Sequence, residues 1–262
     1  MLILLFPPRS EQTQIANYLE SKTSKIQKLI GAKTKQIELL HGHEEYLVHH
    51  AVTKGLDPKA KMKDSDVEWI GEIPLDWGAS KLKNVVRITL GQSPEEEINL
   101  DANGLPFYQG NADFGVKYPT PTSWCISPKK IAEGNDILVS VRAPVGELNI
   151  CKEKSGIGRG VAALTTPNYE FFYYTLKAAF QEMEKLSTGS TFDAIGHREL
   201  SQIKLPNPLS HEKKILVDYL DSETSKIYNA INNIESEIAK LEEYRKSLIY
   251  EVVTGKVKVK AS

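Results

Sequence analysis

The feature that most constrains this chain is a repeat between its two ends. Residues 7–53 and 208–254 align without a gap, so that Tyr18-Leu19 matches Tyr219-Leu220 and Ile26 matches Ile227. The stretch between them, roughly 56–206, has no partner in the repeat. Because the two copies are not contiguous, they cannot be neighbouring units of a solenoid. The pattern indicates two matching arms around one unique globular insert.

Each arm has the spacing of a long helix with a narrow apolar seam, because apolar positions recur in alternating steps of four and three. The predicted seam residues are Leu19, Ile26, Ile30, Ile37, Leu40 and Leu47 in the first arm and Leu220, Ile227, Ile231, Ile234, Ile238, Leu241 and Leu248 in the second. Lys33 and Glu44 interrupt the first seam, and Gly55 and Gly255 are predicted helix stops. So narrow a seam needs a partner. If the insert is compact, the arms leave it together and form an antiparallel coiled coil; two unrelated surface helices are the alternative.

The insert reads as a mixed domain. Strand-like runs punctuated by turns occur at 81–90, 137–141, 147–151, 161–165 and 203–205. One helix follows Asn168, and the aromatic residues on its apolar face are predicted to be core and not a base-stacking platform. The sequence therefore predicts an α+β chain with a short strand in 1–8, a long helix in 9–56, a globular domain in 57–207 and a second long helix in 208–262.

Composition excludes little. The net charge is −1, and the insert carries seventeen Lys and Arg against twenty Asp and Glu, so any DNA-binding surface must be a local arrangement of basic residues. Cys125 and Cys151 match no zinc or CxxC spacing, which predicts reduced thiols in a cytoplasmic protein. The apolar residues 1–6 are too short for a signal peptide or a membrane span.

Motifs for catalysis are missing from the sequence. It contains no GxxxxGK[ST] loop, no GxGxxG after a strand, no HExxH and no GxSxG elbow. The four histidines between 41 and 50 and the acidic run 95–97 are interpreted as solvated surface and not as metal ligands. We therefore expect no catalytic residues, no metal and no cofactor.

The insert does contain polar segments punctuated by glycine. Glutamine and asparagine can bond adenine bidentately, arginine can bond guanine or phosphate, and hydroxyls and glycine amides can bond phosphate oxygens. The candidate DNA-binding residues are Gln92, Ser93, Gln109, Asn111, Arg142, Arg159, Gly189, Ser190 and Thr191. Taken singly, ordinary turn chemistry explains each of these segments as well.

In their order along the chain, several segments resemble the specificity subunit of Type I restriction-modification systems. The resemblance covers essentially the whole chain. It is carried by 66–74 (DVEWIGEIP), 134–142 (GNDILVSVR) with Gly146, 159–163 (RGVAA), 189–195 (GSTFDAI) and 205–208 (LPNP) leading into a heptad helix. The family pattern has two recognition domains that alternate with two helical regions. This chain departs from it and resembles the second half of a subunit, whether as a natural half-subunit, a split gene or a truncated form.

The resemblance implies a non-catalytic subunit that reads one half of a bipartite target in double-stranded DNA. It implies that the long helices are a spacer and a dock for modification (methyltransferase) subunits, in a complex that also holds restriction (endonuclease and translocase) subunits. The assembled complex would carry DNA adenine methyltransferase and endonuclease activities. It further implies DNA contacts at Gly189, Ser190 and Thr191, and at Arg142 and Arg159, although the arginines could instead brace the fold by pairing with carboxylates. Two copies could form a homodimer that reads a palindromic split site.

Two other functions are open on the sequence alone. The chain could be a coiled-coil scaffold whose insert binds protein, which salt-sensitive DNA binding would contradict. It could also be a fragment of a fused restriction and methylation enzyme, which the missing catalytic motifs disfavour.

Overall fold

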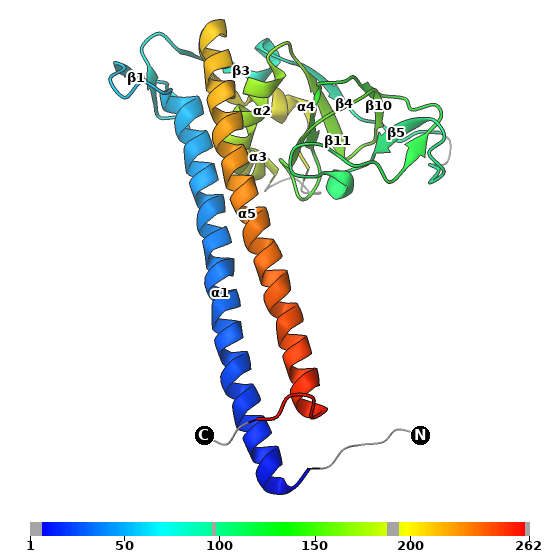
Figure 1. Cartoon of the computed structure of the whole chain (residues 1–262). Helices are drawn as coiled ribbons and strands as arrows, with labels where there is room; N and C mark the ends of the chain where they lie inside the picture. The colour runs from blue at the N-terminus through cyan, green and yellow to red at the C-terminus, as the bar shows by residue number, and fades with distance from the viewer. Residues whose placement is uncertain (1–6, 96–97, 188–193, 260–262) are drawn as a thin grey trace. The chain divides into compact units, whose positions relative to one another are not determined.

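The computed structural model describes residues 7–95, 98–187 and 194–259 (Figure 1). Long helices at the two ends of the chain flank a sheet domain, so the predicted α+β class is confirmed. The chain divides into two compact units, a coiled-coil unit of residues 1–44 with 222–262 and a globular unit of residues 45–221. Both divisions fall inside the long helices and not at their ends. The last turns of the first helix and the first turns of the last helix are therefore part of the globular unit.

The helices of the chain are α1 (Arg9–Lys54), α2 (Tyr169–Ala178), α3 (Phe180–Ser187), α4 (His197–Gln202) and α5 (Ser210–Val253). Gly55 and Gly255 have φ values of 75° and 74°, in the left-handed region that glycine adopts without strain. Both predicted helix stops are thus confirmed. None of the helices in the described ranges is long and apolar enough to cross a membrane.

Within the coiled-coil unit the two long helices run antiparallel (Figure 1). Gln27 bonds Arg245, Lys33 pairs with Glu237, and Glu44 bonds Tyr228, so partner numbers fall as the α1 numbers rise. An apolar cluster joins the helices, with Ile26 and Ile30 from α1 and Leu248 and Val252 from α5 buried in it. The seam that the heptad spacing predicts therefore lies between these two helices.

The globular unit contains two four-stranded sheets and two strand pairs. The first sheet has the order β4-β11-β8-β9, and all its neighbours are antiparallel. The second has the order β6-β5-β10-β7, with β5 and β10 parallel. The strands are β1 (Met62–Asp64), β2 (Glu72–Pro74), β3 (Gly78–Lys81), β4 (Arg87–Leu90), β5 (Leu105–Tyr108), β6 (Trp124–Cys125), β7 (Ile131–Ala132), β8 (Ile137–Ser140), β9 (Leu148–Ile150), β10 (Ser155–Ile157), β11 (Val161–Thr165) and β12 (Lys204–Asn207).

Strands β8 and β11 are buried on both faces, which explains why they read as continuous apolar runs. Alternate side chains face opposite ways along a strand. Ile137 and Val139 accordingly join the larger core cluster, which also holds α2 and the start of α5. Leu138, Val161 and Ala163 join a smaller cluster with β5 and β10 of the second sheet. The turn between β10 and β11 therefore passes from one sheet to the other, next to the ends of β4 and β5.

Two predicted elements differ from the structure. The run 81–90 is interrupted by a 3₁₀ turn at Leu82–Asn84, because Leu82 is fully buried and its amide bonds the carbonyl of Ile203. The helix after Asn168 ends at Ala178 and restarts at Phe180. Met183 stays fully buried across this break, so the apolar face was predicted correctly although the break was not.

Candidate nucleic-acid interface

Three loops meet where the two sheets of the globular unit join, and backbone hydrogen bonds hold them together. They are 91–93 after β4, 109–111 after β5, and 158–160 between β10 and β11. The amide of Gln92 donates to the carbonyl of Ile157 at 3.0 Å, and the amide of Gly160 donates to the carbonyl of Gln109 at 3.0 Å. Adjoining loops thus hold four of the predicted site residues, namely Gln92, Ser93, Gln109 and Arg159. Asn111 lies two residues after Gln109, at the end of the loop 109–111.

Glycine allows these loops to come so close. A Cβ at Gly91 would lie 2.1 Å from the carbonyl oxygen of Gly158, and a Cβ at Gly160 would lie 2.3 Å from that of Gln109. Neither position has room for a side chain, whatever its φ. The loops are therefore packed backbone against backbone, which leaves the side chains between the glycines to point outward.

The amide side chains on these loops are available for intermolecular bonds. Gln92 and Gln109 are exposed and Asn111 is half-buried. Within the described ranges no hydrogen bond is formed by any of the three side-chain amides, and the loop contacts of Gln92 and Gln109 are made by their backbone groups. Each amide keeps the donor and acceptor pair that can bond an adenine edge.

Arg142 joins the same region from β8. The amide of Val141 donates to the carbonyl of Gly160 at 2.9 Å, and the backbone of Arg142 bridges that of Ala194. The arginine is exposed and lies two residues after the end of β8, next to the buried Val141. Ala194 directly follows 188–193, so the predicted residues Gly189, Ser190 and Thr191 lie outside the described residues.

Among the described residues, neither arginine has an acidic partner. Arg159 donates from Nε to Ser93 Oγ at 2.7 Å, and Arg142 forms no side-chain bond within the part of the chain that is described. No described carboxylate pairs with either of them, in contrast to the alternative that they brace the fold. The nearby acidic run is partly neutralised, since Lys129 lies 2.6 Å from Glu95 and holds the pKa of that carboxyl below its usual value. The interface thus presents two cations and three amides.

Sequence comparison assigns the chain to a family. The Type I restriction modification DNA specificity domain matches residues 74–240, which include all three loops and the first half of α5. The chain belongs to this family. It is 37% identical to a type I restriction enzyme specificity subunit, MjaX, from Methanocaldococcus jannaschii, with 97% of this chain and 59% of that protein covered. It is 29% identical to the MjaVIII specificity subunit of the same organism, with 97% and 62% covered.

Solved structures show the same architecture. A chain from a structural study of complex assembly and conformational transition of the type I R-M system matches with a TM-score of 0.77 at 28% identity, covering 95% of this chain and 60% of that one. The HsdS subunit from Thermoanaerobacter tengcongensis matches with a TM-score of 0.62 at 28% identity, covering 97% and 60%. The chain therefore spans about 60% of the length of the specificity subunits it matches.

In this member of the specificity family, the predicted seam residues differ in burial. Ile26, Ile30, Ile227, Ile231 and Leu248 are buried in the coiled-coil unit. Leu19, Ile37, Leu40, Ile234, Ile238 and Leu241 are half-buried there. Leu47 and Leu220 belong to the globular unit, where Leu220 is fully buried in the larger core and Leu47 packs against it.

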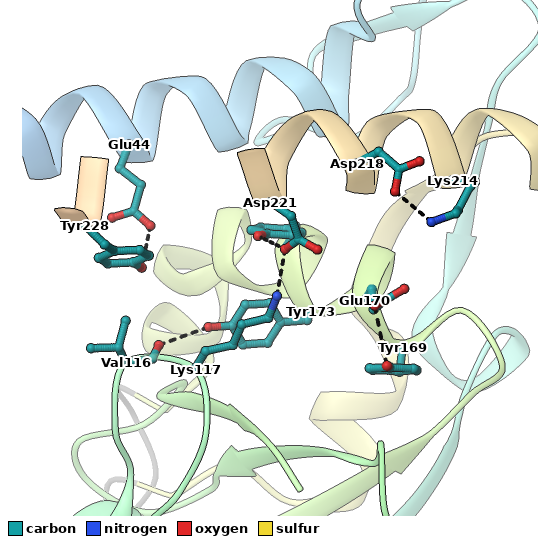
Figure 2. A network of polar contacts seen from close by, with 11 residues as sticks. Glu44, Val116, Lys117, Tyr169, Glu170, Tyr173, Lys214, Asp218, Asp221 and Tyr228 are labelled. Carbon is teal, nitrogen blue, oxygen red and sulfur yellow. Dashed lines mark hydrogen bonds and ion pairs between the residues drawn. The ribbon is translucent and has the colours of Figure 1, made fainter. Parts of the chain in front are cut away.

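The polar interruptions of the seam have partners. Lys33 forms an ion pair with Glu237. Glu44, only 3% exposed, accepts a hydrogen bond of 2.6 Å from the hydroxyl of Tyr228 (Figure 2). Burial, and then the hydrogen bond to Glu44, raises the pKa of the Tyr228 hydroxyl. These polar pairs fix the register of the two helices in a way that apolar contacts alone would not.

One network in the globular unit was not found from the sequence. Asp221, at the end of the α5 segment in this unit, accepts from Lys117 at 2.7 Å and from the Tyr174 hydroxyl at 2.5 Å (Figure 2). The Tyr173 hydroxyl donates to the carbonyl of Val116 at 3.2 Å. The network ties the loop around 117 to α2 and to α5. No local sequence pattern predicts this network, because its residues come from three segments that are distant in the sequence.

Proposed function

We propose that this chain is a non-catalytic DNA-recognition module of a type I restriction-modification specificity subunit, and that it reads one part of a bipartite target. The observation that carries the proposal is the gathering of Gln92, Gln109 and Asn111 with Arg142 on adjoining segments, where none of these side chains forms a bond to another described residue. Such groups offer base-edge and phosphate contacts together. Family membership supports the same function, since the matched family is a DNA specificity domain. A protein of this function acts in the cytoplasm, where the DNA lies.

The division of labour in the proposal follows the sequence prediction. Residues 57–207 recognise DNA, and the helices 9–56 and 208–262 are the spacer and the dock for modification and restriction subunits. Exposed apolar side chains on the helices of the coiled-coil unit support a docking role, among them Leu29, Leu39, Tyr244 and Tyr250, which are 53–65% exposed. The same side chains support a homodimer as one arrangement of the free chain.

Selection from a random duplex library tests the proposal. The full chain, alone and with a methyltransferase subunit, is used to enrich duplexes over several rounds, and affinities of the enriched and a scrambled duplex are compared by fluorescence anisotropy. We expect a short consensus and at least a tenfold preference for it. Absence of enrichment, or binding without salt dependence, would contradict DNA recognition and favour the coiled-coil scaffold. Mass measurement in solution tests the homodimer separately.

A further inference from the structure

The Arg159 guanidinium is held by one of its nitrogens. It lies on the turn between β10 and β11, between Gly158 and Gly160, whose amides bond the carbonyls of Tyr108 at 2.8 Å and Gln109 at 3.0 Å. Its Nε donates to Ser93 Oγ at 2.7 Å, and Ser93 is half-buried on the adjoining loop. Both ends of this contact are therefore anchored in the packed backbone of the interface.

This contact leaves a defined set of donors. A guanidinium has five N–H donors in one plane. With Nε occupied by Ser93, the edge that combines Nε with one terminal nitrogen is not available for a bidentate bond. The two terminal nitrogens, Nη1 and Nη2, form no bond within the described part of the chain. Arg159 can therefore bind a planar pair of acceptors only through Nη1 and Nη2 together. The bond to Ser93 restricts the orientation of the guanidinium plane in such a contact.

Guanine offers the acceptor pair that fits this geometry. Its O6 and N7 lie side by side in the major groove, and an arginine fork that bonds both is the commonest specific contact in protein–DNA complexes. A phosphate can also accept a bidentate arginine. It carries no sequence information, however, so a fixed guanidinium plane beside the amides of Gln92 and Gln109 is of most use at a base edge. Arg142, whose side chain has no such support, is the contrasting case and suits a phosphate.

We infer that Arg159 reads a guanine of the target through Nη1 and Nη2, and that Ser93 is the positioning residue that sets the plane of its guanidinium. The inference rests on the proposed function and deepens it, because it places a G·C pair in the recognised half-site. It also separates the two arginines of the interface by role.

The test uses 7-deazaguanine, which keeps Watson–Crick pairing but lacks the N7 acceptor. In the duplex enriched by the wild-type chain, each guanine is replaced in turn and the affinity is measured by anisotropy. At one guanine we expect the wild type to lose several-fold in affinity, less than the roughly 5- to 150-fold of a complete bidentate pair, because O6 is still available. At that same guanine, Arg159→Ala should lose less than about twofold on the replacement, because its contact to N7 is already absent.

Variants of Ser93 test the positioning role. Ser93→Ala removes the acceptor for Nε and should reduce the penalty of the 7-deazaguanine several-fold. Ser93→Thr keeps the hydroxyl and should restore the penalty. Circular dichroism and tryptophan fluorescence verify that each variant is folded, since Trp69, Trp77 and Trp124 all lie in the globular unit.

The outcomes separate this inference from the proposed function. If no duplex is enriched by the wild type, the proposed function fails and the inference fails with it. If a consensus is found but no guanine in it shows a penalty that depends on Arg159, only the inference fails. If the penalty depends on Arg159 but is equal in wild type and Ser93→Ala, Arg159 reads guanine and the role of Ser93 is wrong.

Discussion

A methyl group at position 91 would meet the carbonyl oxygen of Gly158 at 2.1 Å, far inside any van der Waals contact. The same is true of position 160 against Gln109. At the scale of single residues, the candidate interface therefore depends on glycines, which let the loops approach, as much as on the polar side chains. Residue chemistry alone suggested the polar groups, but the close approach of the loops is visible only in three dimensions.

Gly91→Ala should destabilise the globular unit and weaken DNA binding. Relief of the overlap requires one backbone to move, and such overpacking costs about 1–3 kcal/mol in the free energy of unfolding. Gly110→Ala is the matched control on the adjoining loop, because its φ is −164° and a Cβ there meets nothing within 4 Å. Urea unfolding followed by tryptophan fluorescence compares them. Equal stability of the two variants would show that the loops can separate without cost.

Among the candidate residues, sequence reasoning could anticipate the local setting of the polar side chains but not which of them come together. Gln92, Ser93, Gln109 and Arg159 lie in loops, as the glycine punctuation indicated, whereas Asn111 begins a 3₁₀ turn and Arg142 forms an isolated β-bridge. That they lie on adjoining loops could not be predicted, because it depends on the parallel pairing of β5 with β10 across an intervening 46 or more residues of chain. The bond from Arg159 to Ser93 depends on the same pairing and was likewise not foreseen.

At the scale of elements, hydrophobic periodicity predicts long helices well and very short strands poorly. The long helices were predicted to within two residues at their N-termini because a heptad seam repeats many times over each. Strands β6 and β7 have two residues each, which is too short for any alternation to show. The sequence therefore did not predict the second sheet. It did predict β8 and β11, which are buried on both faces and read as continuous apolar runs.

The buried pair of Glu44 and Tyr228 makes the coiled-coil unit sensitive to alkaline pH. Burial and the bond to Glu44 raise the pKa of Tyr228 in the folded chain, whereas an unfolded tyrosine titrates near pH 10. Below about pH 10 the stabilisation is fully present. As pH rises further, the unfolded state loses its proton first, so stability falls by at most about 1.4 kcal/mol per pH unit from this group.

Tyr228→Phe should therefore be less stable than wild type at pH 8, by about 1–3 kcal/mol for the donor lost to a buried carboxylate. At pH 11 this difference should shrink by about 1.4 kcal/mol. Urea unfolding followed by circular dichroism at 222 nm measures both. Tyr250→Phe, at a tyrosine 57% exposed on the same helix, is the matched control for removal of a tyrosine hydroxyl. A difference that is the same at pH 8 and pH 11 would contradict the coupling.

At the scale of the whole molecule, the net charge of −1 gives the chain no general attraction for a polyanion. DNA binding must then depend on a few placed cations, and the number of phosphates they neutralise sets the salt dependence. In the described part of the interface, Arg142 is the exposed cation whose side chain forms no intramolecular bond. It is the natural candidate for a phosphate contact, whereas Arg159 is already held by Ser93.

Arg142→Ala should weaken binding to the enriched and the scrambled duplex by the same factor, because a phosphate contact carries no sequence information. The slope of log K against log salt concentration should become shallower by about 0.9, the value for one phosphate on duplex DNA. Lys63→Ala removes an equal charge from β1, which Figure 1 shows on the opposite side of the globular unit from β5, and should leave the slope unchanged. If Arg142→Ala instead weakens only the enriched duplex and keeps the wild-type slope, Arg142 contacts a base and the assignment of roles to the two arginines is reversed.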